Sequence, residues 1–236
     1  LNGAYSLQYF LPNKEDVLAA YTAILDANKT AQKPDIWRAR EVALDGQKTT
    51  PVVVGVWDSG TDVSLYKDQL FTNMKEIPDN KKDDDQNGFV DDAHGIGWTL
   101  HSDYTADLLF PIGTVLSDPD AYKADVKGLT DLQANLDSPE ATALKQKLAA
   151  LPQDKVNPFI EGLGAYSQYA HGTHVAGIAA QGNPAARLLV SRITFDYHTI
   201  PEKPTVEQAN KDAAAMVQTV EYFKKNGVRA VHMSWG

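Results

Sequence analysis

The 236-residue sequence contains no cysteine, which excludes disulfide bridges, thiolate metal sites and a cysteine nucleophile. It also lacks any run of 18 apolar residues, so we expect no membrane-spanning helix. Basic residues are outnumbered, since 22 Lys and Arg stand against 31 Asp and Glu, a formal net charge of −9. Because nucleic acids and anionic membrane surfaces attract basic proteins, we expect neither as a partner.

Apolar residues make up 43% of the chain, which is enough to build a sizeable core. The negative charge is unevenly distributed along the sequence. Residues 59–170 hold 19 acidic and 9 basic side chains, a net charge of −10, whereas the remaining residues carry a net charge of +1. The acidity therefore belongs to one segment of the chain.

Three apolar runs, at 51–60, 187–194 and 228–233, predict strands buried in a sheet. Between the last two, residues 204–226 have the periodicity of a long helix, with a capping box that begins at Thr205 and an Asn-Gly end. A strand, a helix and a strand of these lengths form a βαβ unit. The fold class is therefore predicted to be α/β, an open, mostly parallel sheet with helices on both faces.

Ahead of this core, residues 14–29 have a helical apolar pattern, with Asn13 as the predicted N-cap. A second short helix is predicted at 36–44, ended by Asp-Gly. We interpret residues 1–50 as a helical extension that precedes a domain spanning 51–236.

Residues 62–168 do not follow the strand and helix rhythm of the core. They are loop-rich to about residue 115, and Ser138 followed by Pro139 then predicts a helix N-terminus. We interpret this segment as an acidic insertion packed on the core sheet.

Two residues are candidates for acid–base chemistry. Asp58 ends the first buried strand, at the edge where sites form in open parallel sheets, although an Asp that begins a turn gives the same pattern. His171 opens the segment HGTHVAGIAA, which we interpret as a helix of small residues beginning at an exposed general base. The alternative is a zinc pair with His174, but no third ligand or HExxH pattern supports it, and we expect His174 to be packed.

The last segment, VHMSWG, predicts a buried strand that breaks at Ser234, Trp235 and Gly236. A glycine at this point lets a peptide backbone lie alongside as an added strand. These residues are therefore candidates for peptide binding.

Together the three segments resemble the subtilisin-like serine proteases, or subtilases. VVVGVWDSGTDV is similar to the strand that carries the catalytic aspartate of that family, HGTHVAGIAA to its catalytic-histidine motif, and VHMSWG to the strand beside its primary specificity pocket. The resemblance implies a serine endopeptidase in which Asp58 orients the imidazole and His171 transfers the proton. It further implies a polypeptide substrate held by Ser234, Trp235 and Gly236, and a secreted or periplasmic location.

The sequence also departs from the family. The Gly-Thr-Ser-x-Ala motif of the nucleophile does not occur in it, and 112 residues separate Asp58 from His171. We therefore expect residues 1–236 to be the N-terminal part of the catalytic domain, with a sheet incomplete at its C-terminal end. On this hypothesis the polypeptide is inactive alone, and its partner is the remainder of the same domain. The alternative is a degenerate, non-catalytic subtilase fold that binds peptides.

An aspartate-rich turn lies inside the acidic segment. Asp83, Asp85 and Asn87 occupy positions 1, 3 and 5 of a calcium loop, with Gly88 at position 6, and Asp91 or Asp92 is a further candidate ligand. No glutamate stands at position 12, and a solvated acidic loop is the alternative. A similar stretch occurs in bacterial subtilases, so calcium is the one cofactor predicted, with no organic cofactor.

Overall fold

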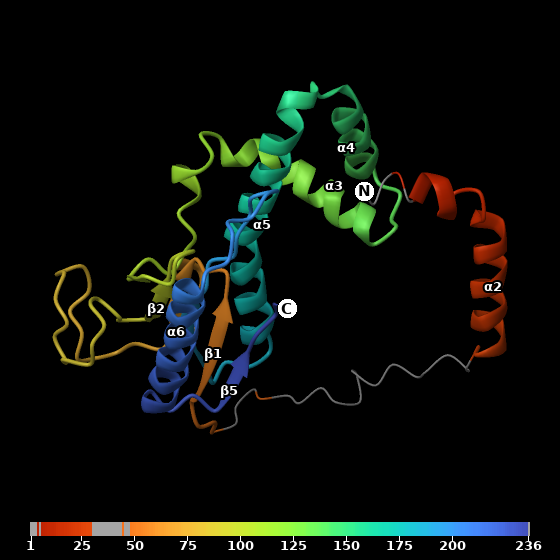
Figure 1. Cartoon of the computed structure of the whole chain (residues 1–236). Helices are drawn as coiled ribbons and strands as arrows, with labels where there is room; N and C mark the ends of the chain where they lie inside the picture. Colours follow the sequence, from red (N-terminus) through yellow and green to blue (C-terminus); the bar gives the residue numbers. More distant parts are fainter. Residues whose placement is uncertain (1–3, 5, 30–43, 45–47, 236) are drawn as a thin grey trace. The chain divides into compact units, whose positions relative to one another are not determined.

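The computed structural model describes residue 4, residues 6–29, residue 44 and residues 48–235 (Figure 1). The chain divides into two compact units, Leu1–Asp45 and Gly46–Gly236. Gly236 lies outside the described residues. So does the helix predicted at 36–44, in which Leu44 alone is described. None of the helices in the described ranges has the length and apolarity needed to cross a membrane.

The first unit contains a short π-helix, Ser6–Phe10, followed by helix α2, Lys14–Ala27, which confirms the helix predicted at 14–29. Asn13 is the N-cap residue of α2, as predicted, but its side chain makes no capping hydrogen bond, and its Nδ2 donates to the Tyr9 carbonyl at 2.9 Å. The Asn13 backbone (φ −102°, ψ 13°) is not in the extended region that a capping side chain requires, so the amide points back along the preceding turn.

The second unit is built on a five-stranded sheet in the order β3-β2-β4-β1-β5. All neighbouring strands are parallel except β2 and β3. This sheet confirms the predicted α/β fold class. The strands are β1 (Val52–Asp58), β2 (Gly95–Trp98), β3 (Tyr104–Thr105), β4 (Ala186–Arg192) and β5 (Ala230–His232).

The helices of this unit are α3 (Lys123–Gln133), α4 (Pro139–Ala150), α5 (Gln153–Ala180) and α6 (Val206–Lys225), with 3-10 helices at Val63–Gln69, Ile112–Thr114 and Pro119–Tyr122. Two predicted N-caps are confirmed. Ser138 Oγ accepts from the Ala141 amide and Thr205 Oγ1 from the Gln208 amide, each at 3.0 Å.

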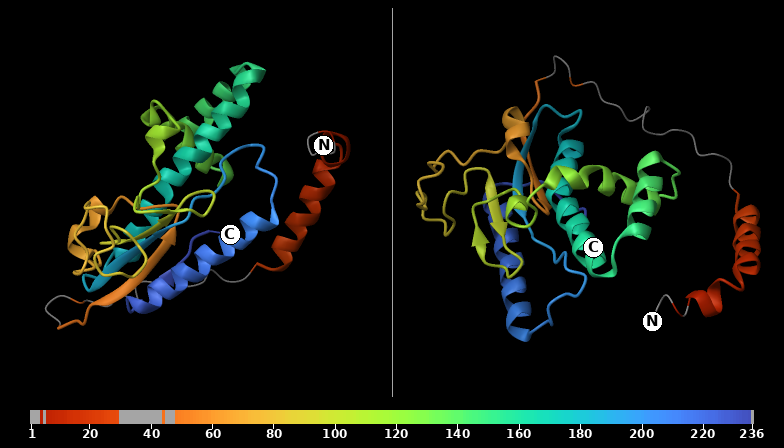
Figure 2. Two further views of the ribbon diagram at one scale, coloured as in Figure 1. Left: turned by 60° about the vertical axis from the view of Figure 1, so that its left-hand side comes forward. Right: turned by 90° about the horizontal axis from the view of Figure 1, so that it is seen from above.

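Side chains alternate across the sheet and build a core on each of its faces. Val56 of β1 packs with Val175 and Ala176 of α5, whereas its neighbour Trp57 packs with Phe223 of α6. Figures 1 and 2 show β1 lying between α5 and α6. The predicted placement of helices on both faces is therefore confirmed.

Strand β5 differs from the prediction of a buried strand. It pairs with β1 on one side and forms an edge of the sheet, and Val231 and Met233 are 43% and 53% exposed. The apolar run at 228–233 predicted a strand correctly. It could not distinguish an edge strand from a central one, because the same residue types favour both.

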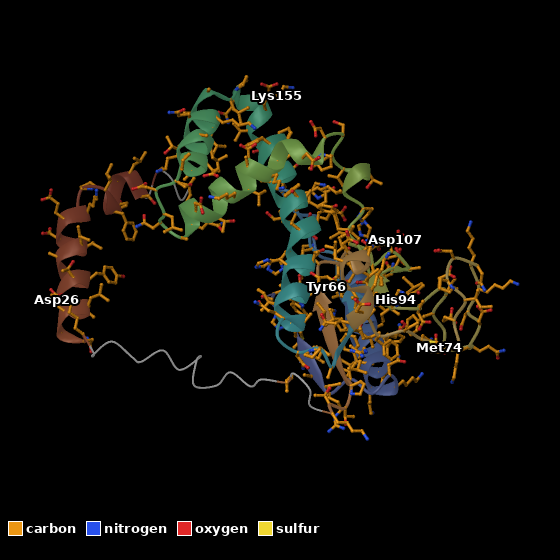
Figure 3. All side chains as sticks on the ribbon, turned by 180° about the vertical axis from the view of Figure 1, so that it is seen from behind. Asp26, Tyr66, Met74, His94, Asp107 and Lys155 are labelled. Carbon is orange, nitrogen blue, oxygen red and sulfur yellow. The ribbon has the colours of Figure 1, made fainter. Side chains whose placement is uncertain are left out.

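Helices α3 and α4 and the first part of α5 share a small core of their own. Leu144, Phe159 and Leu163 are buried at its centre. Figure 3 places Lys155 at the end of α5 remote from the sheet. The helical part of the predicted insertion therefore packs around an apolar core of its own within the second unit.

We expect Leu144→Ala to lower the free energy of unfolding by about 3 kcal/mol, because Leu144 is fully buried and its truncation leaves a cavity. Urea denaturation of the wild-type protein and the variant measures the difference. Leu136→Ala is the matched control, since Leu136 is 57% exposed and its truncation should change stability by less than about 0.5 kcal/mol. Equal losses in the two variants would contradict a packed core in this segment.

Candidate active site

Asp58 is positioned by the alternation of strand β1. It follows Val54 and Val56 at a spacing of two, so its side chain lies on the face of the sheet that α5 covers. The residue is only 1% exposed. A carboxylate in this place requires hydrogen-bond donors from its surroundings, because burial without them is costly.

His171 lies inside helix α5, which corrects the prediction that a helix begins at this residue. The helix starts 18 residues earlier, at Gln153. Residues 153–170 contain no helix stop, since Pro158 lies near the helix N-terminus and removes a single hydrogen bond. The small residues after His171 therefore continue an existing helix instead of starting a new one.

The two side chains meet directly. His171 Nδ1 lies 2.7 Å from Asp58 Oδ1, which also accepts from the Ser59 amide at 2.8 Å and the Ser59 hydroxyl at 3.2 Å. The Asp58 Oδ2 atom is buried and has no hydrogen-bond partner among the described residues. The His171 side chain is 46% exposed, so the ring edge opposite Nδ1, which carries Nε2, is the accessible one.

Asp58 and His171 are separated by 112 residues in the sequence, and the close approach of two backbone segments brings them into contact. A Cβ atom on Gly172 would lie 2.2 Å from the carbonyl oxygen of Gly60, in the loop after β1. Thr173 fixes the same junction, because its Oγ1 accepts from the Asp62 amide at 2.9 Å and its carbonyl accepts from the Tyr66 hydroxyl at 2.6 Å. Figure 3 shows Tyr66 beside α5. The Gly and Thr of the HGTH segment thus dock the helix onto the end of β1.

An open cleft of about 470 Å³ borders His171. Trp235 lies in its wall, where the indole Nε1 donates to the Trp57 carbonyl at 2.5 Å and the ring packs against Phe195 at 5.9 Å between centroids. Ser234 lines the same cleft. The structure therefore brings His171 together with two of the three residues predicted to bind peptide, and the third, Gly236, lies outside the described residues.

Gln168 is a site residue that the sequence interpretation missed. Its side-chain amide donates to the Phe195 carbonyl at 2.7 Å and accepts from the Phe195 amide at 2.9 Å, and its own carbonyl accepts from the Ser59 hydroxyl at 2.7 Å. It therefore links α5 to the loops after β1 and β4. The signal for Gln168 in the sequence was its position three residues before His171. This spacing places the two side chains on one face only if a single helix runs through both residues.

No serine in the described part of the chain hydrogen-bonds to His171. The buried Ser59 hydroxyl has one proton, which lies between the Gln168 carbonyl at 2.7 Å and Asp58 Oδ1 at 3.2 Å, whereas Ser167 and Ser234 line the cleft. The site consequently contains an imidazole and the buried carboxylate that contacts its Nδ1 atom. An attacking hydroxyl is not in place within this part of the chain.

The prediction that His174 is packed is wrong, because the residue is exposed on α5. It follows His171 by three residues and lines a second cleft together with Tyr66 and Tyr169. In the described ranges, the single group of three or more carboxylate and imidazole ligand atoms comprises Glu76, Asp83 and Asp85. His171 and His174 therefore have no described third ligand with which to hold zinc.

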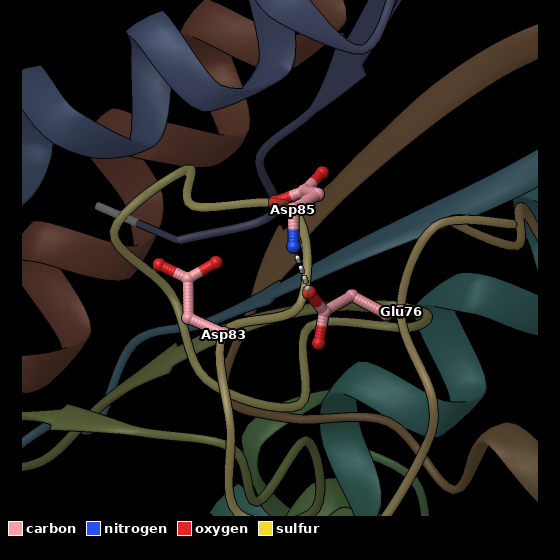
Figure 4. A group of neighbouring side chains, drawn as sticks. All are labelled: Glu76, Asp83 and Asp85. Carbon is pink, nitrogen blue, oxygen red and sulfur yellow. Dashed lines mark hydrogen bonds between the residues drawn. The ribbon is translucent and has the colours of Figure 1, made fainter.

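The predicted calcium turn is well formed, but the group of neighbouring carboxylates differs from the predicted ligand set. Asp83 accepts from the amides of Asn87 and Gly88 at 3.0 and 2.8 Å, which closes the turn. The Asp91 carboxylate accepts from the amides of Asn80 and Lys81 and lies outside the ligand group. Glu76 joins Asp83 and Asp85 instead (Figure 4). No sequence pattern marked Glu76, because it precedes the turn by seven residues.

The fold and the site together define an α/β protein in which a buried carboxylate contacts a half-exposed imidazole at the carboxyl ends of parallel strands. Comparison of the chain with protein-family models, curated proteins and solved structures gave no match.

Proposed function

We propose that this chain supplies the aspartate and the histidine of a serine endopeptidase of the subtilisin type. The observation that carries the proposal is the 2.7 Å contact between His171 Nδ1 and the buried Asp58 carboxylate, beside an open cleft. A carboxylate bound to Nδ1 selects the tautomer in which Nε2 is free to accept a proton. This is the arrangement that a general base requires.

In the proposed reaction, His171 Nε2 accepts the proton of a serine hydroxyl as its oxygen attacks the scissile carbonyl carbon. The imidazolium then gives that proton to the leaving amine as the peptide C–N bond breaks, which leaves an acyl-enzyme. Water attacks the ester by the same proton route and restores the serine. The negative charge of Asp58 stabilises the imidazolium in both steps, and burial makes its effect larger than in water.

We infer that the attacking serine lies outside residues 1–236. The Ser59 hydroxyl hydrogen-bonds to Gln168 and Asp58, and Ser167 and Ser234 line the cleft without a hydrogen bond to His171. The partner that this proposal requires is the remaining part of the same catalytic domain.

We further propose that the substrate is an extended polypeptide that runs beside Ser234 and Trp235. The support is their position on the cleft that His171 borders. Trp235 is held by its hydrogen bond to the Trp57 carbonyl, next to Asp58, so the segment keeps a fixed position relative to the base.

A fluorophosphonate probe, which reacts with activated serines, tests the proposal. The product of the full reading frame that encodes residues 1–236 should bind one probe per chain and hydrolyse an unfolded fluorescent polypeptide. Residues 1–236 alone should bind none. Stoichiometric labelling of residues 1–236 would contradict the inference of an external serine.

The second candidate, a peptide-binding fold without catalysis, is favoured because no described serine hydrogen-bonds to His171. It predicts neither labelling nor hydrolysis by the full product, together with saturable binding of unfolded polypeptide. That result would end the endopeptidase proposal.

A further inference from the structure

The first unit has no buried core among its described residues. Neither the π-helix Ser6–Phe10 nor helix α2 contains a buried side chain. Figure 1 shows the two helices as separate coils joined by a short turn at residues 11–13. A helix of 14 residues is marginal in water unless an apolar face packs against a partner. The unit therefore needs a contact that its described residues do not provide.

The apolar side chains of α2 and of the turn before it form one stripe. They recur at spacings of three and four residues, which places them on one face of the helix. The exposed members of this stripe, each between 58% and 67% exposed, are Leu11, Leu18, Tyr21, Ile24 and Leu25. The opposite face carries Ala19, Ala23 and Asp26. The stripe is therefore a surface suited to another apolar surface.

One half of the stripe is hollow and the other half is not. A groove of about 440 Å³ lies between the π-helix and the first half of α2, with Leu7, Val17 and Leu18 among the side chains that line it. Ile24 and Leu25 lie one turn beyond Tyr21, the last residue of α2 that lines the groove. Each unit thus offers a hollow at one end and two large exposed side chains at the other.

A second copy of the same unit, placed antiparallel, matches both ends at once. A two-fold axis near Tyr21 would bring Ile24 and Leu25 of each copy over the groove of the other. A parallel pair would instead place groove against groove and would leave both hollows empty. The shape of the stripe therefore favours an antiparallel partner with the same stripe.

The charges agree with this orientation. Glu15 and Asp16 lie in the first turn of α2, whereas Lys29 follows its C-terminal end, where it pairs with Asp26 at 2.6 Å. In an antiparallel pair, the acidic start of each helix lies beside the Lys29 ammonium group of the other. Lys14 lines the groove and would meet the C-terminal carbonyls of the partner helix, which favour a cation. In a parallel pair the two Lys14 side chains would face each other and repel.

We propose that α2 pairs antiparallel with α2 of a second copy of this chain, with Ile24 and Leu25 of each copy in the groove of the other. The dimer would give the helix the apolar contact that it lacks within the unit. It would also bring two copies of the candidate active site into one particle. This pairing does not depend on the proposed proteolysis.

Sedimentation equilibrium of residues 1–236 provides the first test. As the concentration rises, the mass should approach twice the 25.8 kDa of the chain. Leu18→Glu keeps a good helix former but places a charge in both grooves of the dimer. It should raise the dissociation constant by about 30-fold, because two buried leucines are lost per dimer.

Val217→Glu is the matched control, since Val217 is 62% exposed on helix α6 of the second unit. It should change the dissociation constant by less than about twofold. A monomeric mass at every concentration would overturn the proposal in favour of another occupant, such as the second unit of the same chain. A dimer that Leu18→Glu leaves intact would also overturn it, and would point to the exposed edge of β5.

The absence of cysteine allows the orientation to be tested with single thiols. Tyr21 lies near the proposed axis, so Tyr21→Cys should form disulfide-linked dimers in a mild oxidant. In Leu25→Cys the two thiols would lie about 12 Å apart along the helices, which is beyond the reach of a disulfide. This variant should cross-link about tenfold more slowly. Equal rates, or a faster Leu25→Cys, would mean that the helices do not pair antiparallel and would overturn the proposal.

Discussion

Replacing His171 by Ala in the full protein is expected to lower kcat for peptide hydrolysis by about 10⁶-fold, the largest effect we predict. The imidazole is the group that accepts and returns the proton in the proposed reaction, and no other described base contacts Asp58. A serine hydroxyl without this base is a weak nucleophile at neutral pH. Single-turnover hydrolysis of a fluorogenic peptide measures the loss.

His174→Ala is the matched control for this variant. His174 is three residues away on the same helix, is exposed, and lies outside the Asp58 contact. Its replacement should leave kcat within about twofold, and both variants should melt within a few degrees of the wild-type protein. Equal losses in activity for the two variants would mean that His171 is not the base.

Asp58→Asn should lower kcat by about 10⁴-fold, a smaller loss than that of His171→Ala. The amide oxygen can keep the position of Oδ1, which accepts from Ser59 and His171. The negative charge that stabilises the imidazolium is lost, however, and the buried NH₂ group has no described acceptor. The double variant should be no less active than His171→Ala alone, because the two residues act as one unit.

Gly172→Ala is expected to lower the free energy of unfolding by about 3 kcal/mol and kcat by about 100-fold. The added Cβ would lie 2.2 Å from the Gly60 carbonyl oxygen and 2.9 Å from the Gly60 nitrogen, and both are backbone atoms that cannot rotate away. Helix α5 must therefore move away from the loop after β1, which lengthens the 2.7 Å contact between Asp58 and His171. Urea denaturation and peptide hydrolysis measure the two losses.

Gly177→Ala, on the same helix, controls for the substitution itself. Its Cβ would meet only the Tyr66 hydroxyl, at 3.1 Å, which belongs to a movable side chain. Because Ala favours a helix over Gly by about 1 kcal/mol, stability should change by no more than about that amount. If Gly172→Ala is equally mild, the close backbone approach does not hold the site together.

Local patterns in the sequence were sufficient to predict several elements. The apolar run before Asp58 predicted β1, and the Thr205 and Ser138 caps correctly marked the starts of α6 and α4. These features depend on neighbours within a few residues, which the sequence displays directly. The same patterns missed β2, because its sequence GIGW is short and half glycine.

The candidate site was predictable only in part, and chiefly through the resemblance of Asp58 and His171 to a known pair of motifs. Gln168 and Glu76 carry no such motif. Gln168 acquires its role from the extension of α5 back to Gln153, and Glu76 from a loop that returns it to the aspartate-rich turn. Neither arrangement is encoded in spacing along the chain.

The sequence by itself determined the kind of fold, the place of Asp58 at the end of a strand, and the concentration of negative charge between Asp58 and His171. The tertiary structure decided which groups meet. It placed His171 against Asp58 through the contact of Gly172 with Gly60, made β5 an edge strand, and set Glu76 rather than Asp91 beside Asp83 and Asp85. Alternation and capping act between near neighbours in the sequence. Contacts between residues more than a hundred positions apart depend on how whole elements pack, and packing is decided by the fold as a whole.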